Sequence, residues 1–262
     1  VAAVVNQYAA DADIIHLKVA PDFSDGNIRD IDVESALQWV IDNGGAYSVA
    51  AVNISLGTLT TFSDYATSFL TTEINNLYSL GIPTIIASGN VGEQFGVSSP
   101  ANNSPLAFVV GAVDDNQTAS TFTNKHPDLV DIYALGTDTP IESNQGIGLF
   151  SGTSFAVPQV AGAIAALQEA SLELIGEKLS PQEIENLIIA TGDNGEEIYD
   201  QRKAKFLQIG RDQGFSKSSN LEGGLSYKES AIEKFKAHIN KHNLVYAGIG
   251  LIVITTLIAL LF

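Results

Sequence analysis

A serine near the middle of the chain stands where it could act as a nucleophile. Ser154 follows a turn of small residues, Ser151-Gly152-Thr153, and begins an apolar, alanine-rich stretch that runs to about Leu174. Pro158 falls in the expected first turn, where a missing N–H costs little. A helix N-terminus has unpaired N–H groups and a dipole that favours negative charge, and both would stabilise the oxyanion formed when a serine attacks a carbonyl. An ordinary N-cap serine before a buried helix fits the same short pattern.

The longer segment Gly152–Gly162 resembles the nucleophile segment of the subtilisin-like serine peptidases, the subtilases, which is usually written G-T-S-M-A-x-P-H-V-A-G. Phe155 stands in place of the family Met, and Gln159 stands in place of a His that is not a member of the catalytic triad. Earlier in the chain, residues 52–57 (VNISLG) resemble the family's substrate-binding strand. Residues 84–92 (TIIASGNVG) resemble the strand that carries its oxyanion-hole asparagine. Because several motifs follow in the family order, the resemblance is specific.

The resemblance covers residues 1–195 and implies roles for individual residues. It implies that Ser154 attacks a peptide carbonyl to form an acyl-enzyme, and that Asn90 donates a hydrogen bond to the oxyanion together with the Ser154 N–H. It also implies a substrate-binding surface, whose Ala-Ser-Gly wall leaves room for a large side chain, at Ser55, Leu56, Gly57, Ala87, Ser88, Gly89 and Thr153. Taken alone, Asn90 also fits a turn-forming asparagine.

The expected triad partners of the serine are missing from this sequence. The family order is Asp, His, Ser, and the family His lies in H-G-T-x-V-A-G. Val1-Ala2-Ala3 resembles the end of that string. We therefore expect an N-terminally truncated fragment that is inactive alone, with the catalytic Asp and His preceding residue 1. The histidines present lie in other contexts and are poor candidates for the base: His16, His126, His238 and His242. The alternative is a membrane-tethered, catalytically inactive pseudoprotease that binds peptides.

Composition excludes several classes of function. The chain carries 13 basic and 30 acidic residues, a formal net charge of −17. This disfavours nucleic-acid binding, which depends on neutralising phosphates with Lys and Arg. Cysteine is absent, so disulfides, a cysteine nucleophile and thiolate metal sites are excluded. We expect no required cofactor and no catalytic metal. Asp131 matches a family position near a weak cation site, which makes calcium a candidate ion, although an ordinary surface aspartate fits as well.

Apolar patterning predicts alternating strands and helices, and therefore an α/β fold in which helices flank a parallel sheet. The sheet is incomplete if the chain is a fragment. The strands are expected over residues 14–19, 49–56, 83–88, 106–113 and 130–134. The helices are expected over residues 32–42, 65–80, 154–174 and 181–190. Ser180 and Glu183 form the pattern of a capping box at the start of the last helix.

The chain after residue 195 has a different character. Residues 196–243 are polar and charged, which predicts a linker or stalk containing a helix over 228–242. Residues 244–262 carry no charge. A stretch of about 20 apolar residues is long enough to cross a bilayer as a helix. We therefore expect a transmembrane anchor. Lys234, Lys236 and Lys241 precede it, which by the positive-inside rule would place the upstream side in the cytoplasm. The resemblance to secreted subtilases implies instead a peptidase domain on the extracytoplasmic side of the membrane.

Overall fold

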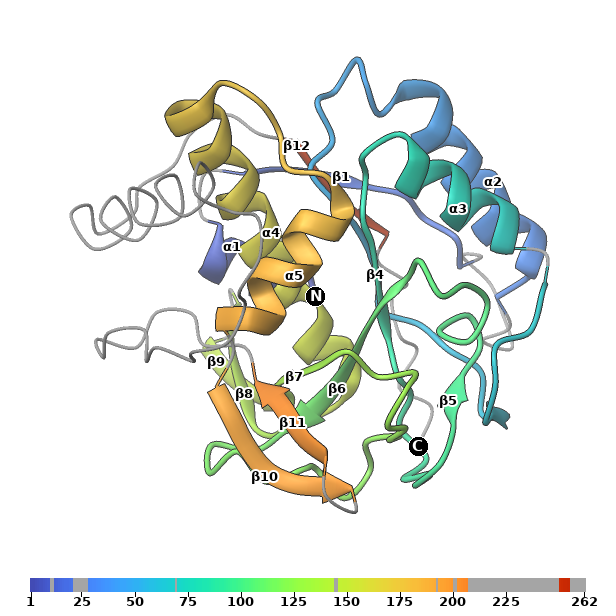
Figure 1. Cartoon of the computed structure of the whole chain (residues 1–262), viewed down its shortest axis with the longest axis vertical. Coiled ribbons are helices and arrows are strands. Elements are labelled where there is room, and N and C mark those ends of the chain that lie inside the picture. The colour runs from blue at the N-terminus through green and yellow to red at the C-terminus, as the bar shows by residue number, and fades with distance from the viewer. Residues whose placement is uncertain are drawn as a thin grey trace, which may run out of the picture.

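Parallel strands form the centre of the structure (Figure 1). The computed structural model describes residues 1–9, 12–20, 28–68, 70–143, 146–191, 193–199, 202–206 and 250–254. Among these residues the main sheet has eight strands, all parallel except β10, which runs antiparallel to β11. In sheet order they are β1 (Asp13–His16), β12 (Gly250–Ile254), β2 (Val52–Ile54), β4 (Thr84–Ala87), β6 (Phe108–Val113), β7 (Ile132–Leu135), β11 (Arg202–Phe206) and β10 (Asp193–Tyr199). The predicted α/β fold with a parallel sheet is confirmed.

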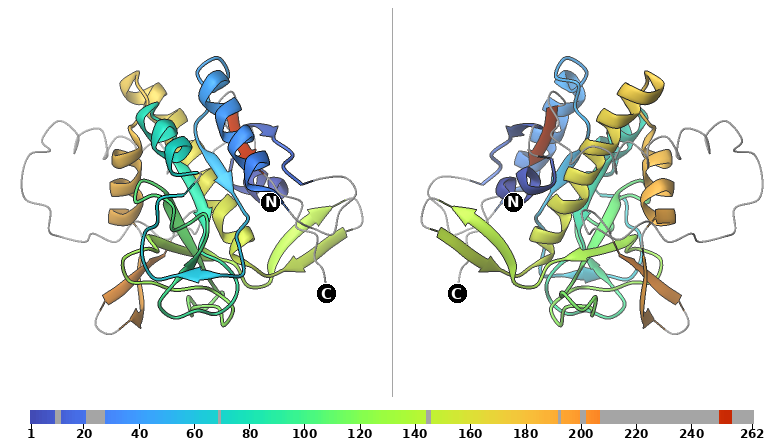
Figure 2. Two further views of the ribbon diagram at one scale, coloured as in Figure 1. Left: turned by 90° about the vertical axis from the view of Figure 1, so that its right-hand side faces the viewer. Right: turned by 90° about the vertical axis from the view of Figure 1, so that its left-hand side faces the viewer.

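Helices cover both faces of this sheet (Figures 1 and 2). One face packs against α1 (Ala2–Tyr8), α4 (Thr153–Ile175) and α5 (Pro181–Thr191). The other face packs against α2 (Asp30–Asn43) and α3 (Thr71–Ser79). The predicted helix over 65–80 is shorter in the structure: α3 begins at Thr71, and residues 65–68 are not helical. The sheet therefore lies between two separate apolar cores.

Successive residues of the central strands enter opposite cores. In β4, Ile85 and Ala87 join the core under α4, whereas Ile86 joins the core under α2 and α3. In β6, Val110 joins the core under α4, and Val109 joins the core under α2 and α3. Side chains alternate between the two faces of a strand, so a parallel strand covered on both faces must be apolar at nearly every position. This explains why these strands read as unbroken apolar runs.

In the described residues, two antiparallel strand pairs lie outside the main sheet. β8 (Thr139–Ser143) pairs with β9 (Gly146–Phe150), and this hairpin projects away from the main sheet (Figure 2). β3 (Thr61–Phe62) pairs with β5 (Val97–Ser98). Neither pair was predicted from the sequence. The end of β9 leads directly into the turn before Ser154.

The capping box predicted at the start of α5 is confirmed. The Ser180 N–H donates a hydrogen bond of 3.0 Å to Glu183 Oε2, and the Glu183 N–H donates one of 3.3 Å to Ser180 Oγ. Each side chain thus satisfies a backbone donor of the other residue, as in the motif read from the sequence.

The helix predicted over residues 244–262 is wrong for the part that the structure describes. Residues 250–254 form β12, which pairs in parallel with β1 on one side and β2 on the other. A short apolar run rich in β-branched residues suits a buried parallel strand, and its periodicity cannot distinguish that strand from a buried helix. Within the described ranges, no helix has the length and apolar character needed to cross a membrane. The other residues of the predicted span lie outside the described residues.

The boundary expected at residue 195 between the peptidase domain and the linker does not coincide with the end of the main sheet. β10 runs across it, and β11 follows at residues 202–206, so both strands extend the main sheet into the region expected to be a linker. The helix predicted over residues 228–242 lies outside the described residues.

α1 lies directly against α4 at a glycine. A Cβ atom on Gly162 would lie 2.7 Å from Tyr8 Cβ and 3.3 Å from the Val5 carbonyl oxygen. Nearby, the Tyr8 hydroxyl donates a hydrogen bond of 2.9 Å to Gln159 Oε1, and Gln159 Nε2 donates to the Leu135 carbonyl. Gln159, which replaces the family His, therefore links α1, α4 and the end of β7.

We predict that Gly162→Ala destabilises the protein. In an exposed helix this change stabilises by about 1 kcal/mol, but here the new methyl group must push α1 away, and overpacking typically costs about 1–3 kcal/mol. Gly45→Ala is the matched control, because no atom lies within 4 Å of its Cβ position. Urea denaturation measures the unfolding free energy of both variants. An unchanged or raised value for Gly162→Ala would contradict the close contact between the helices.

Candidate active site

The first turn of α4 is fixed by the glycine before it. Gly152 is the N-cap residue and has φ of 151°, a conformation that side chains disfavour. Its N–H donates a hydrogen bond of 2.7 Å to the carbonyl of Gly136, which follows β7. A Cβ atom on Gly136 would lie 3.0 Å from the Gly152 carbonyl oxygen. The two glycines therefore let the turn before Ser154 approach the end of the sheet closely.

Asn90 lies beside this turn, and its amide has a defined orientation. Asn90 Oδ1 accepts hydrogen bonds of 2.8 Å from both the Thr153 N–H and the Thr153 hydroxyl. Because these two donors hold the oxygen, Nδ2 is left to donate to another group. The Ser154 N–H makes no hydrogen bond within the described residues. Two donors, one from a side chain and one from the helix N-terminus, are thus available beside one serine.

Ser154 itself is held by Ser55 at the end of β2. Ser154 Oγ donates a hydrogen bond of 3.2 Å to the Ser55 carbonyl oxygen, and Ser55 Oγ donates one of 3.1 Å to the Ser154 carbonyl oxygen. The expectation that Pro158 lies in the first turn is wrong. The helix begins at Thr153, so Pro158 lies in its second turn, where its ring nitrogen cannot donate to the Ser154 carbonyl. The Ser55 hydroxyl takes the place of that donor.

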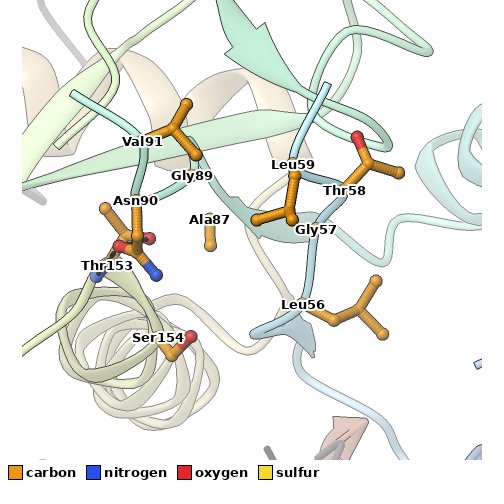
Figure 3. Close-up of a pocket in the computed structure, with 10 residues that line it drawn as sticks. All are labelled: Leu56, Gly57, Thr58, Leu59, Ala87, Gly89, Asn90, Val91, Thr153 and Ser154. Carbon is orange, nitrogen blue, oxygen red and sulfur yellow. Dashed lines mark hydrogen bonds between the residues drawn. The ribbon is translucent and has the colours of Figure 1, made fainter. Parts of the chain in front are cut away.

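A pocket opens directly in front of Ser154 (Figure 3). One wall is residues 56–59, which follow β2, and the other comes from residues 87–91 at the end of β4. Five of the predicted substrate-binding residues line it: Leu56, Gly57, Ala87, Gly89 and Thr153. Ser55 and Ser88 do not line it but are fully buried. Sequence reasoning missed three lining residues that flank the recognised motifs: Thr58, Leu59 and Val91.

The pocket is smaller than the sequence suggested. Its volume is about 80 Å³, whereas a cavity of about 150 Å³ accommodates benzene. Ser98 of β5 lies against one residue of each wall, Gly57 and Gly89. Its Cβ lies 3.1 Å from the Cβ position of Gly57 and 2.9 Å from that of Gly89. Asn124 Nδ2 donates a hydrogen bond of 3.1 Å to Ser98 Oγ and so keeps this side chain in place.

None of the described histidines lies in the pocket. His16 is exposed on β1, and His126 Nδ1 accepts a hydrogen bond of 3.1 Å from the Asp128 N–H in a turn. His238 and His242 lie outside the described residues. These positions agree with the expectation that neither His16 nor His126 is the base for Ser154.

Asp131 is not among the residues that line the pocket and lies directly before β7. Its carboxylate accepts a hydrogen bond of 2.6 Å from the Val109 N–H. Burial of the carboxyl group raises the pKa of Asp131 to about 7. The hydrogen bond from Val109 opposes this shift, and the negative charge of Glu185 adds to it. Other atoms of the residue are partly exposed to solvent. A carboxyl that is partly protonated near neutral pH is a weak cation ligand. No group of three or more His, Asp or Glu side chains gathers as a metal site among the described residues. A role for calcium stays a prediction.

Comparison with known proteins identifies the family. The model for the subtilase family matches residues 2–216. The chain belongs to the subtilase family. The match extends beyond residue 195 and includes β10 and β11, as the sheet does.

Individual subtilase relatives support the same assignment. The alkaline proteinase of Hapsidospora chrysogena is 32% identical over 136 residues, which are 50% of this chain and 32% of that protein. The thermostable alkaline protease of Halalkalibacterium halodurans is 32% identical over 160 residues, 61% of this chain and 40% of that protein. The chain thus spans well under half the length of these curated relatives.

Solved structures show the same fold. The prenylagaramide maturation protease PagA is similar with a TM-score of 0.60 and 27% identity, covering 72% of this chain and 69% of that one. A cold adapted subtilisin-like serine proteinase is similar with a TM-score of 0.55 and 26% identity, covering 72% of this chain and 64% of that one.

We predict that Asn90→Ala in the full-length protein lowers kcat by about 10²- to 10³-fold with little change in KM. The magnitude is the known loss for such a donor in subtilisin, not a value obtained from this structure. The Asn90 amide would act on charge that appears only in the transition state, so ground-state binding should survive. Steady-state kinetics of peptide hydrolysis measures both constants, and the exposed Asn116→Ala serves as control. Wild-type kcat in Asn90→Ala would show that the assignment of the oxyanion donor is wrong.

Proposed function

We propose that the protein containing this chain is a subtilisin-like serine endopeptidase that uses Ser154 as its nucleophile. The observation that carries the proposal is the arrangement around that serine. Thr153 holds Asn90 Oδ1, so that Asn90 Nδ2 and the Ser154 N–H are both available at one end of a pocket. The first turn of α4 contains no acidic residue that would repel an oxyanion. The subtilase membership and the protease relatives support the same reaction.

In the proposed reaction, Ser154 Oγ attacks the carbonyl carbon of the scissile peptide bond while a base accepts its proton. The carbonyl oxygen becomes an oxyanion, which Asn90 Nδ2 and the Ser154 N–H would stabilise. The C–N bond then breaks, the amine leaves with the proton returned by the base, and an acyl-enzyme remains on Ser154. Water hydrolyses this ester by the same steps and releases the second product.

The base in this proposal is a histidine held by an aspartate, both in a segment that precedes residue 1. The resemblance of Val1-Ala2-Ala3 to the end of the family histidine motif supports this placement. These residues lead into α1, which packs against α4. A residue entering just before α1 would therefore arrive next to the helix that carries Ser154. Peptide or protein segments in an extended conformation are the proposed substrates.

The alternative is an inactive peptide-binding protein of the same fold. One observation favours it, namely that Ser154 Oγ donates its proton to the Ser55 carbonyl, which cannot serve as a general base. Both functions use the same pocket. They differ only in whether Ser154 becomes covalently modified.

Ser154→Ala tests the proposal. The full-length protein should hydrolyse peptides and react covalently at Ser154 with a fluorophosphonate, and Ser154→Ala should lose both reactions because no other hydroxyl replaces the nucleophile. Mass spectrometry locates the modified residue. Ser151→Ala, an exposed serine three positions away, is the control and should retain both reactions. Peptide binding without labelling or turnover in the wild-type protein would favour the inactive alternative.

The size of the pocket predicts the side chain that precedes the cleaved bond. The pocket volume of about 80 Å³ is about half of the roughly 150 Å³ that accommodates benzene, so a small aliphatic side chain fits it better than a phenyl ring. We expect substrates with Ala or Val at this position to have a higher kcat/KM than those with Phe. Ser98→Gly should raise the Phe-to-Ala ratio of kcat/KM by about 10-fold or more, since small changes in pocket volume alter discrimination about 10- to 200-fold. Peptide p-nitroanilides that differ only at this residue provide the measurement, and an unchanged ratio would exclude Ser98 as the limit of the pocket.

A further inference from the structure

A proline in α4 leaves the carbonyl of the nucleophile without its helical donor. In an α-helix the N–H of residue i bonds to the carbonyl of residue i−4, so residue 158 would normally donate to Ser154. Pro158 has no N–H and cannot do so. The Ser154 residue is only 3% exposed, and a buried carbonyl without a donor is costly. The structure therefore needs another donor at this point.

Ser55 provides this donor from the end of β2. Ser55 is fully buried, and its hydroxyl donates to the Ser154 carbonyl oxygen at 3.1 Å. Asn53, also fully buried, donates from Nδ2 to Ser55 Oγ at 2.8 Å. Because the Ser55 oxygen accepts from Asn53, the Ser55 proton is left for Ser154. The three residues form a directed chain of hydrogen bonds from β2 to the nucleophile.

In the described part of the structure, this chain of hydrogen bonds leaves one buried polar atom without a partner, and that energetic cost indicates a specific role for Asn53. Asn53 Oδ1 is buried and has no hydrogen-bond partner among the described residues. An apolar residue at this position of β2 would avoid that penalty, and the neighbours Val52 and Ile54 are apolar. What Asn53 contributes is the donor that orients Ser55.

We propose that Ser55, oriented by Asn53, is a positioning residue for Ser154. It replaces the bond that Pro158 removes, and so holds the first turn of α4 against the strand whose continuation, Leu56 and Gly57, lines the pocket. The Ser154 hydroxyl and the Ser154 N–H are thereby held in a fixed position relative to the pocket wall on which a substrate would lie. The proposal rests on the function proposed above, in which Ser154 is the nucleophile.

A double-mutant cycle between Ser55 and Pro158 tests the proposal in the full-length protein. Ser55→Ala should lower kcat by about 10- to 100-fold, because a misplacement of about 1 Å at a reacting group can cost about 10²-fold in rate, with KM changed by less than about 2-fold. Pro158→Ala restores an N–H at residue 158, which can bond to the Ser154 carbonyl. In that background Ser55→Ala should cost no more than about 3-fold. The coupling between the two substitutions is the signature of a shared acceptor.

Ser104→Ala is the matched control. Ser104 is also fully buried, and its hydroxyl donates to Asn75 Oδ1 at 2.6 Å, in contact with α3 and not with α4. This substitution should leave kcat unchanged both in the wild-type protein and in the Pro158→Ala background. An equal loss of kcat on Ser55→Ala in both backgrounds would overturn the proposal, because the Ser55 hydroxyl would then act independently of the missing helical bond.

The rate of Ser154 labelling by a fluorophosphonate distinguishes this inference from the proposed function. No labelling of the wild-type protein at Ser154 refutes the proposed function. The same double-mutant cycle, measured as the midpoints of urea denaturation, then tests the hydrogen bond between Ser55 and Ser154 without requiring enzymatic activity. A stability loss on Ser55→Ala that is smaller in the Pro158→Ala background than in the wild-type background supports the bond, and equal losses overturn it.

Discussion

Three segments of the sheet converge on one turn of one helix, and the site depends on this convergence. Gly152 bonds to Gly136 after β7, Thr153 bonds to Asn90 after β4, and Ser154 bonds to Ser55 after β2. The three partners all follow the carboxyl ends of parallel strands in the same sheet. In open parallel sheets this edge is where ligands bind, because loops from several strands meet there. A parallel sheet is therefore a condition for assembling this site and not only a scaffold beneath it.

Close approach at this edge is possible only because side chains are absent or small. Gly152 and Gly89 both have positive φ, and added side chains at Gly89 and Gly136 would collide with neighbouring atoms. Glycine in such positions costs conformational entropy on folding. The two apolar cores on either side of the sheet offset that cost, since their central strands are fully buried. The same closeness brings Ser98 against Gly57 and Gly89, which line the pocket.

The electrostatic setting of the site contrasts with that of the whole chain. The formal net charge is −17, yet no charged residue lines the pocket and the first turn of α4 has no acidic residue. Negative charge close to the helix N-terminus would compete with a developing oxyanion for the same backbone donors. Keeping carboxylates away from this end of α4 leaves its positive partial charge available to a reacting carbonyl.

Local sequence was sufficient for five strands of the main sheet (β1, β2, β4, β6 and β7), for the helices α2 to α5 and for two members of the site. The alternation of apolar runs predicted the α/β sheet, the capping box at Ser180 was correct, and the motifs around Ser154 and Asn90 marked a helix start and a strand end that the structure brings together. Only tertiary structure decided the rest. Ser55 lies 99 residues from Ser154 and Ser98 lies 26 residues from Asn124, so their contacts depend on pairing between distant segments that no local period records. Residues 250–254 are apolar enough for a membrane helix or a buried strand. A parallel strand satisfies its backbone N–H and C=O groups only through hydrogen bonds to other strands. Pairing with β1 and β2 therefore decided that these residues form a strand.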